Sequence, residues 1–101
     1  MTDNFLRLAG IVTEKPTFKK SPAGIEHCNF VIEHRSMQKE AELPRNTFCY
    51  MPVAVSGTLA SQLKNQLSKG MQLRVSGFIT YHQSKNKPGK LVLHAQYIEQ
   101  I

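Results

Sequence analysis

The chain has 101 residues, a length that favours one domain with one modest core. Hydrophobic residues make up 41% of it and charged residues 20%, which is ordinary for a soluble globular protein, and no apolar run approaches the ~20 residues needed to cross a membrane. Thirteen Lys and Arg against seven Asp and Glu give a formal charge of +6, which predicts attraction to polyanions. No secretory signal begins at Met1, so we expect a cytoplasmic protein.

The chain begins with a predicted strand and a basic loop. A strand is predicted over residues 5–13, with one row of side chains from Leu6, Leu8 and Val12, and Gly10 inside it predicts a bulge or a sharp bend. Residues 15–24 hold the turn-forming Ser-Pro and Ala-Gly pairs and read as a loop. This loop carries Lys19 and Lys20, which are candidate phosphate contacts.

A second strand is predicted over residues 25–36, with Arg35 on its outward row. Arg35 can pair with phosphate and stack on a base, although an ion pair with Glu33 on the same row is the alternative. Residues 37–46 have mixed charge and contain Pro44, which argues against sheet pairing. We therefore expect a polar loop there.

The third strand, residues 47–55, gives the most informative pattern of the chain. Its inward row is apolar and consists of Cys49, Met51, Val53 and Val55. Because strand side chains alternate between faces, Phe48 and Tyr50 are expected on the opposite face, outside the core. Exposed rings on a basic protein predict stacking on unpaired bases, and the alternative is packing under the preceding loop, residues 37–46, or at a dimer interface.

A change of period after the third strand predicts a helix. Leucines recur every four residues from 59 to 67, which marks one stripe of a helix of about ten residues. Ser56 or Thr58 is expected to cap its start, and Gly70 to stop it in the left-handed conformation.

Two more strands are predicted, over residues 71–81 and 91–100. The alternation of the last strand is imperfect, so we expect a bulge and assign no faces to it. The loop between them, residues 82–90, contains a Pro-Gly turn and three candidate phosphate-binding lysines: Lys85, Lys87 and Lys90.

Five strands with one helix between the third and fourth is the order of the oligonucleotide-binding barrel, the OB-fold. We therefore predict an all-β protein with a single OB-fold domain over residues 1–101. In such barrels the groove crosses the second and third strands and is flanked by the loops that join strands 1–2 and 4–5. Those loops are residues 15–24 and 82–90, and they hold six lysines.

Several segments resemble known families. The stretch from Val55 to Phe78 is similar to the middle of bacterial single-stranded DNA-binding proteins. The segments Ser21–Cys28, Phe30–Ser36, Met51–Val53 and Leu91–Ala95 resemble the family of primosomal replication protein N, PriB. The resemblance covers nearly the whole chain, and the His34-Arg35-Ser36 motif is not demanded by a generic barrel.

The resemblance implies a homodimer that binds single-stranded DNA during replication restart and docks the restart helicase PriA and the loading protein DnaT. It places DNA contacts on Lys19, Arg35, Phe48, Lys85 and Lys90. Two positions depart from the family pattern, because Phe48 stands where members often carry Trp and Gln83 where they carry Lys. Both departures imply weaker DNA binding, and Lys87 can replace the missing charge.

No catalytic, metal or cofactor site is expected. The four histidines come from three separate segments without other ligands at metal-binding spacing, and no nucleophile, base and orienting group cluster together. His82 is near enough to the last loop to reach a bound strand. Cys28 and Cys49 fall on inward rows and are expected as free thiols.

Three functions fit these patterns. The leading one is sequence-independent binding of single-stranded DNA, with electrostatic capture by the basic loops followed by stacking. The second is a protein-interaction adaptor whose outer barrel face mainly docks primosome proteins. The third is an RNA-binding OB-fold of the cold-shock or translation-factor type.

Overall fold

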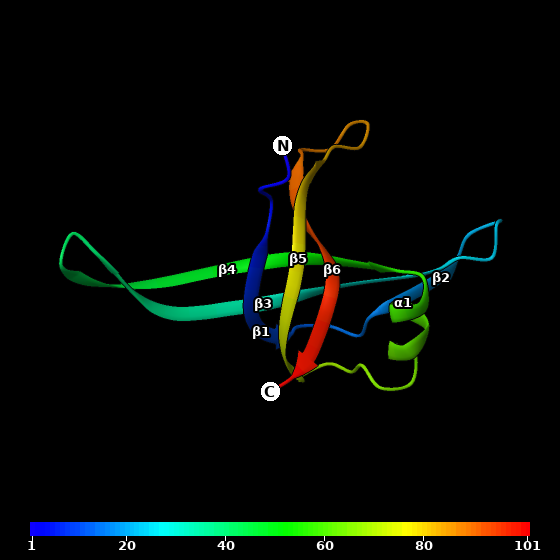
Figure 1. The fold of residues 1–101 in the computed structure, drawn as a ribbon, viewed down its shortest axis with the longest axis horizontal. Helices are drawn as coiled ribbons and strands as arrows, with labels where there is room; N and C mark the ends of the chain where they lie inside the picture. The colour runs from blue at the N-terminus through cyan, green and yellow to red at the C-terminus, as the bar shows by residue number, and fades with distance from the viewer.

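The computed structural model describes residues 1–101 and shows a barrel from which two strands project far to one side (Figure 1). The sheet order is β1-β5-β6-β4-β3-β2, and an additional β1–β3 pairing closes five of these strands into the barrel. The all-β OB-fold prediction is confirmed. The elements are β1 (Leu6–Val12), β2 (Thr17–Lys20), β3 (Glu26–Glu40), β4 (Leu43–Ser56), α1 (Thr58–Leu63), β5 (Gln72–His82) and β6 (Lys90–Gln100).

The barrel closes over a short seam. Strand β1 pairs with β5 along its length but with β3 only through Ile11↔Glu33 and Val12↔Ile32. At this seam a side chain on Gly10 would come within 2.7 Å of the Glu33 carbonyl oxygen, so only glycine lets the strands cross there. The predicted bend at Gly10 thus coincides with the closure of the barrel.

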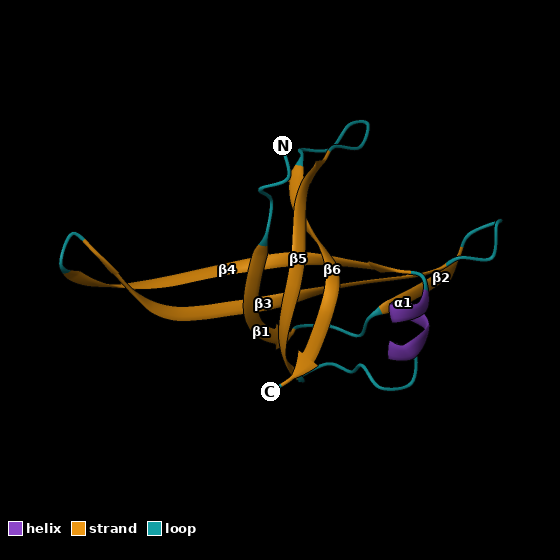
Figure 2. Ribbon diagram, viewed as in Figure 1, coloured by secondary structure: helices purple, strands orange, loops and turns teal.

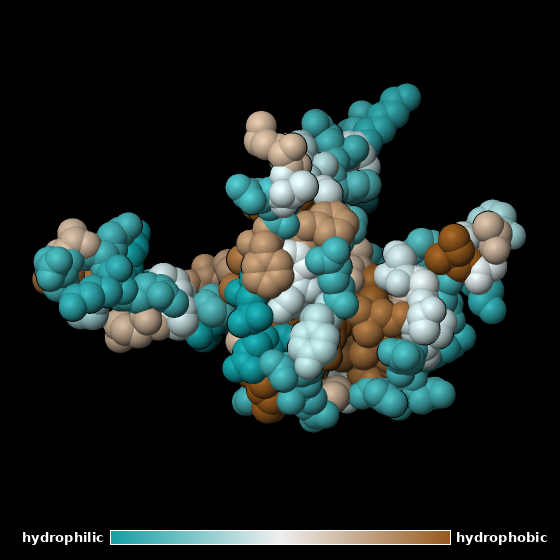
Figure 3. Space-filling model, viewed as in Figure 1, coloured by the Kyte–Doolittle hydropathy of each residue, from teal (hydrophilic) through white to brown (hydrophobic).

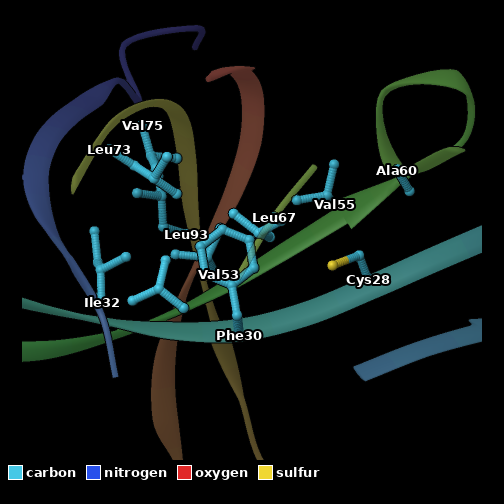
Figure 4. Packing of buried hydrophobic residues seen from close by; sticks show 11 residues of the cluster. Cys28, Phe30, Ile32, Val53, Val55, Ala60, Leu67, Leu73, Val75 and Leu93 are labelled. Atoms are coloured by element: carbon cyan, nitrogen blue, oxygen red, sulfur yellow. The ribbon is translucent and has the colours of Figure 1, made fainter. Parts of the chain in front are cut away.

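The barrel interior is filled by side chains from all five of its strands, from α1 and from the segment after it (Figure 4). These side chains form one cluster, as expected for a small barrel. The inward row predicted for the third strand is confirmed at Val53 and Val55, which are sealed, while Met51 packs at the cluster's edge. The cluster consists of Val12, Cys28, Phe30, Ile32, Val53, Val55, Ala60, Leu67, Leu73, Val75 and Leu93.

The helix differs from its prediction. It has six residues instead of about ten, and Gly57 precedes it with no side-chain cap from Ser56 or Thr58. Leu67 lies beyond its end yet is buried, because a turn continues the chain inward after Leu63. Gly70 has a positive φ of 90°, but it lies seven residues past the helix and donates its N–H to the Val12 carbonyl. The spacing of Leu59, Leu63 and Leu67 therefore reflects packing against the core at the end of the barrel and does not give the length of the helix.

The prediction of a polar loop over residues 37–46 is wrong, because most of these residues belong to β3 and β4. Strands β3 and β4 stay paired to Glu40↔Leu43, and only Ala41 and Glu42 form the turn, with φ of 52° and 67°. Two successive positive φ values are the geometry of a type I′ turn, which suits the twist of a two-strand hairpin. Pro44 is tolerated because a two-strand ribbon has free edges. We call residues 36–47 the arm.

Two smaller outcomes concern loops and register. Part of the loop expected at residues 15–24 is a sixth strand, β2, which pairs with β3 outside the barrel. The bulge expected in the last strand is confirmed, because Ser76 pairs with Tyr97 while Gly77 pairs with Ala95. Figure 2 shows the single helix among strands, and no helix is long and apolar enough to cross a lipid bilayer.

Candidate nucleic-acid interface

The outer rows of β3 and β4 form one continuous surface, which we call the outer face. The two strands are antiparallel, so their outward residues stand opposite each other in register. From the arm toward the end of β4 near α1, the pairs are Arg35↔Phe48, Glu33↔Tyr50, Val31↔Pro52, Asn29↔Ala54 and His27↔Ser56.

An aromatic cluster occupies the arm end of the outer face. Phe48 is 48% exposed and Tyr50 59% exposed, so the prediction that both rings lie outside the core is confirmed. Their ring centroids are 5.0 Å apart with an interplanar angle of 81°. The guanidinium of Arg35 lies over the Phe48 ring at 4.5 Å. Each ring is therefore held by a neighbour and still presents area to solvent.

The ion pair considered as an alternative for Arg35 is present. Its Nη2 atom donates to Glu33 Oε1 at 3.1 Å. The Arg35 side chain is nevertheless 71% exposed, so this pair stabilises the fold by only ~0–1 kcal/mol. The guanidinium thus has donors free for a ligand while Glu33 fixes its position.

A groove of about 430 Å³ lies on the outer face next to the aromatic cluster, where the OB-fold places its ligand. One wall comes from residues 14–17 and the other from the ends of β5 and β6 around the β5–β6 loop. The polar and charged residues that line it are Glu14, Lys15, Thr17, Asn29, Thr80, His82, Lys90 and His94.

The lysines of the β5–β6 hairpin, two in the loop and Lys90 at the start of β6, stand beside this groove. Lys90 lines it, and Lys87 lines an adjoining hollow with His82 and Ser84. Lys85 lies in the same loop, and none of the three lysines forms an ion pair. Figure 3 shows hydrophilic residues covering this projecting hairpin. The charges are therefore available to a polyanion.

Lys19 and Lys20 lie further along the sheet, where Lys19 stands opposite His27 of the outward row and Lys20 opposite Glu26 of the inward row. They sit on β2 and line a hollow of about 340 Å³ together with His27 and Ser56, whose Nδ1 and Oγ atoms are 2.9 Å apart. The predicted site residues thus fall into three separate groups: the aromatic cluster on the outer face, the lysine hairpin beside the groove and the two lysines of β2. The structure does not bring them to a single point.

Sequence reasoning missed the centre of the groove. The alternation of the second strand puts Asn29 on the same outward row as Arg35 but indicates no role for it, and Lys15 contributes to the prediction only as a charge of the first loop. His94 was unassigned, because the bulge at residues 95–97 shifts the register of β6 and hides which face each side chain takes. The available signal was the position of Asn29 on an outward row that also holds Arg35.

The four histidines do not gather into a metal site, and no group of three or more His, Cys, Asp or Glu stands close enough to hold an ion. His34 has a structural role. Its Nδ1 lies 2.6 Å from the Ala9 carbonyl oxygen and its Nε2 lies 2.8 Å from Ser36 Oγ. It joins β1 to β3 beside the seam, where backbone pairing has stopped.

Both cysteines are free thiols. Cys28 is fully buried, and burial, with a smaller contribution from the Glu26 carboxylate, raises its pKa to about 11. Glu26 is itself only 7% exposed and accepts a hydrogen bond from Lys64 Nζ at 3.1 Å. This pair anchors the segment after α1 to β3 under the Lys19 end of the outer face.

The barrel and its groove define an OB-fold protein. The family model described as "another single-strand binding protein family" matches residues 4–97. The replication restart protein PriB of Photorhabdus laumondii is 54% identical over 101 residues, which is 100% of this chain and 96% of that protein. The PriB of Photobacterium profundum is 48% identical over 98 residues, 97% of this chain and 94% of that protein.

Solved structures of related proteins have the same fold. The PriB structure from Ralstonia solanacearum has a TM-score of 0.78 at 26% identity and covers 96% of both chains. The small single-stranded DNA-binding protein of Streptomyces coelicolor has a TM-score of 0.81 at 17% identity, covering 100% of this chain and 95% of its own, and so supports the fold. The chain belongs to the PriB family of replication restart proteins, within the single-strand binding OB-fold proteins.

Proposed function

We propose that this protein binds single-stranded DNA without sequence preference during replication restart. The observation that carries the proposal is the outer face, where the exposed and pre-positioned rings of Phe48 and Tyr50 share one surface with a groove flanked by unpaired lysines. The names of its relatives supply the replication context. They describe binding and restart proteins, and we propose no catalytic step.

Binding is proposed to occur in two stages. Lys85, Lys87 and Lys90 attract the phosphate backbone first, because unpaired charges on a projecting loop act at distances near the Debye length of ~10 Å. The bases then stack on Phe48 and Tyr50, and each stacked base contributes ~1–3 kcal/mol whatever its identity. Lys19, Lys20 and Arg35 hold phosphates along the rest of the face. Duplex DNA gains only the first stage, because its bases are already paired.

A titration of fluorescent oligo-dT against duplex DNA of the same length, each at two salt concentrations, tests this proposal. We expect much tighter binding of oligo-dT and an affinity that falls steeply with salt. Equal affinity for both ligands, or no dependence on salt, would contradict it. An equal-length RNA competitor decides whether the ligand is DNA, as proposed, or RNA.

We further propose that the whole chain acts as one domain in the cytoplasm, bridging single-stranded DNA to the restart helicase PriA and the loading protein DnaT. A competition assay addresses the shared use of the outer face. If DNA and helicase use the same residues, oligo-dT displaces the helicase, whereas simultaneous saturable binding of both places them on different surfaces.

The arm favours a second role as a protein-interaction adaptor. Met37 and Leu43 are 63% and 66% exposed on a ribbon that extends away from the barrel (Figure 1). Exposed apolar side chains on a projecting hairpin suit protein docking more than phosphate binding. If the double variant Met37→Ser, Leu43→Ser loses helicase binding but keeps its affinity for oligo-dT, the arm is the docking element.

We also propose a homodimer. Because β1 pairs with β3 only at Ile11 and Val12, most of that edge carries no strand partner. An unpaired edge is a ready surface for strand addition by a second copy. Sedimentation equilibrium should give twice the chain mass of 11.4 kDa at micromolar concentration.

A further inference from the structure

One lateral row of side chains crosses the floor of the groove. The register places Phe78 of β5 opposite His94 of β6, His94 beside Ala54 of β4, and Ala54 opposite Asn29 of β3. The last three of these residues line the groove. Across four adjacent strands the row therefore runs from two rings, Phe78 and His94, over the small Ala54 to Asn29.

The imidazole of His94 stands upright in this row with one ring face covered. Its ring is stacked on Phe78, with centroids 4.9 Å apart and an interplanar angle of 7°. This separation matches the ~4.8 Å spacing of neighbouring strands, so the two rings face each other across the sheet. Thr80 Oγ1 lies 2.7 Å from His94 Nε2 and fixes the ring's rotation.

The other ring face of His94 looks across β4, where the side chain is only the methyl group of Ala54. Asn29 stands one strand further, so the open interval between His94 and Asn29 spans two strand spacings, or ~9–10 Å. A planar base about as thick as an aromatic ring fits this interval. The Asn29 amide at its far side can donate and accept hydrogen bonds.

We infer that the space above Ala54 is a slot for a single nucleobase, with the imidazole of His94 as its stacking wall and Asn29 as its polar end. This inference rests on the proposed binding of single-stranded DNA. Lys15 and Lys90 flank the slot and hold the phosphates on either side of the base, while the carboxylate of Glu14 disfavours a phosphate inside it. The DNA strand then runs from the lysine hairpin across this slot to the Phe48–Tyr50 cluster.

Affinity for oligo-dT in the variants His94→Ala and Ala54→Leu tests the slot. The first removes the wall and the second fills the space, so each should weaken binding by about 5- to 100-fold, the effect of one lost stacked base. His94→Phe keeps a flat ring and should bind like the wild type. Tyr97→Ala is the control, because it removes an exposed ring of the same strand outside the groove. Thermal melting of each variant reports whether the barrel is intact.

An oligomer of abasic spacers separates stacking from phosphate binding. The preference of the wild type for oligo-dT over this oligomer should shrink in His94→Ala and stay unchanged in Tyr97→Ala. Unchanged affinity in both groove variants while Phe48→Ala weakens binding overturns the slot and leaves the proposed function standing. Failure of His94→Phe to restore binding assigns His94 a structural role and also overturns the slot. A wild type that does not bind oligo-dT overturns both.

Discussion

The aromatic cluster at the arm end of the outer face and the lysine hairpin beside the groove hold their side chains in opposite ways. At the arm end, Phe48 is held by the Tyr50 ring at 5.0 Å and by the Arg35 guanidinium at 4.5 Å. On the lysine hairpin, Lys85 and Lys87 have no ionic partner and are exposed to solvent. Ordered side chains lose little conformational entropy on binding, whereas free lysines lose more but attract a ligand from a distance. The contrast assigns capture to the hairpin and most short-range specificity for unpaired bases to the aromatic cluster.

The largest expected effect comes from removing the capturing charges. The triple variant Lys85→Ala, Lys87→Ala, Lys90→Ala should weaken oligo-dT binding by about 100-fold or more at 50 mM salt, and reduce the slope of log affinity against log salt by about 2. Fluorescence anisotropy across a salt series measures both. A loss of affinity with an unchanged slope would contradict phosphate contact by these lysines.

The aromatic end should respond differently. Phe48→Ala should weaken oligo-dT binding by about 5- to 100-fold while the salt slope stays constant, because stacking releases no counterions. Phe48→Trp supplies a larger ring and should strengthen binding. Phe5→Ala is a matched control, since Phe5 is also exposed beneath an arginine, with Arg7 at 5.8 Å, but away from the outer face. Equal losses for Phe5→Ala and Phe48→Ala would remove the special role of the cluster.

A smaller effect is expected from releasing Arg35. Glu33→Gln removes the ion pair and a negative charge on the outer face, so affinity should rise by about 2- to 5-fold at low salt and the gain should vanish at high salt. Glu40→Gln breaks a comparable pair with Arg45 on the arm and should change nothing. A loss of affinity in Glu33→Gln would mean that Glu33 is needed to position the guanidinium.

The smallest effect on binding is expected from changes to the two cysteines. The reactivity of each thiol instead measures how well the sheet around it is closed. At pH 8 a thiol reagent should modify the half-buried Cys49 much faster than the fully buried Cys28, because burial raises the pKa of Cys28 to about 11. The folded thiol keeps its proton between pH 9 and 11 while the unfolded thiol loses it, so the free energy of unfolding falls as the pH rises through this window. Cys28→Ala should bind oligo-dT normally and show a shallower fall. Rapid modification of Cys28 would indicate an open sheet.

Alternation along a half-buried strand predicted the parts of the site that follow a strict period. Phe48 and Tyr50 lie outside the core because their neighbours Val53 and Val55 pack inside it. The arm could not be predicted, because its turn uses Ala41 and Glu42 at positive φ where glycine or asparagine is the usual signal.

The groove floor escaped prediction for a different reason. The position of His94 depends on a bulge in β6 and on parallel pairing between Ala54 and His94, which are forty residues apart in the sequence. The imperfect alternation of the last strand indicated the bulge but not its position, and the pairing of Ala54 with His94 leaves no local pattern at all. The sequence therefore predicts which side chains of β4 face outward, while the partner of each across the sheet comes only from the folded barrel.

Amide and side-chain NMR shifts during titration with oligo-dT test the central claim most directly. We expect the shifts to concentrate on the outer face, at Phe48, Tyr50, Asn29 and His94, and in residues 85–90. Residues of α1 and the loop that follows it, residues 58–70, should remain unshifted because they close the far end of the barrel. Saturable shifts confined to that helix end, with Phe48 and the lysine hairpin unchanged, would contradict the account.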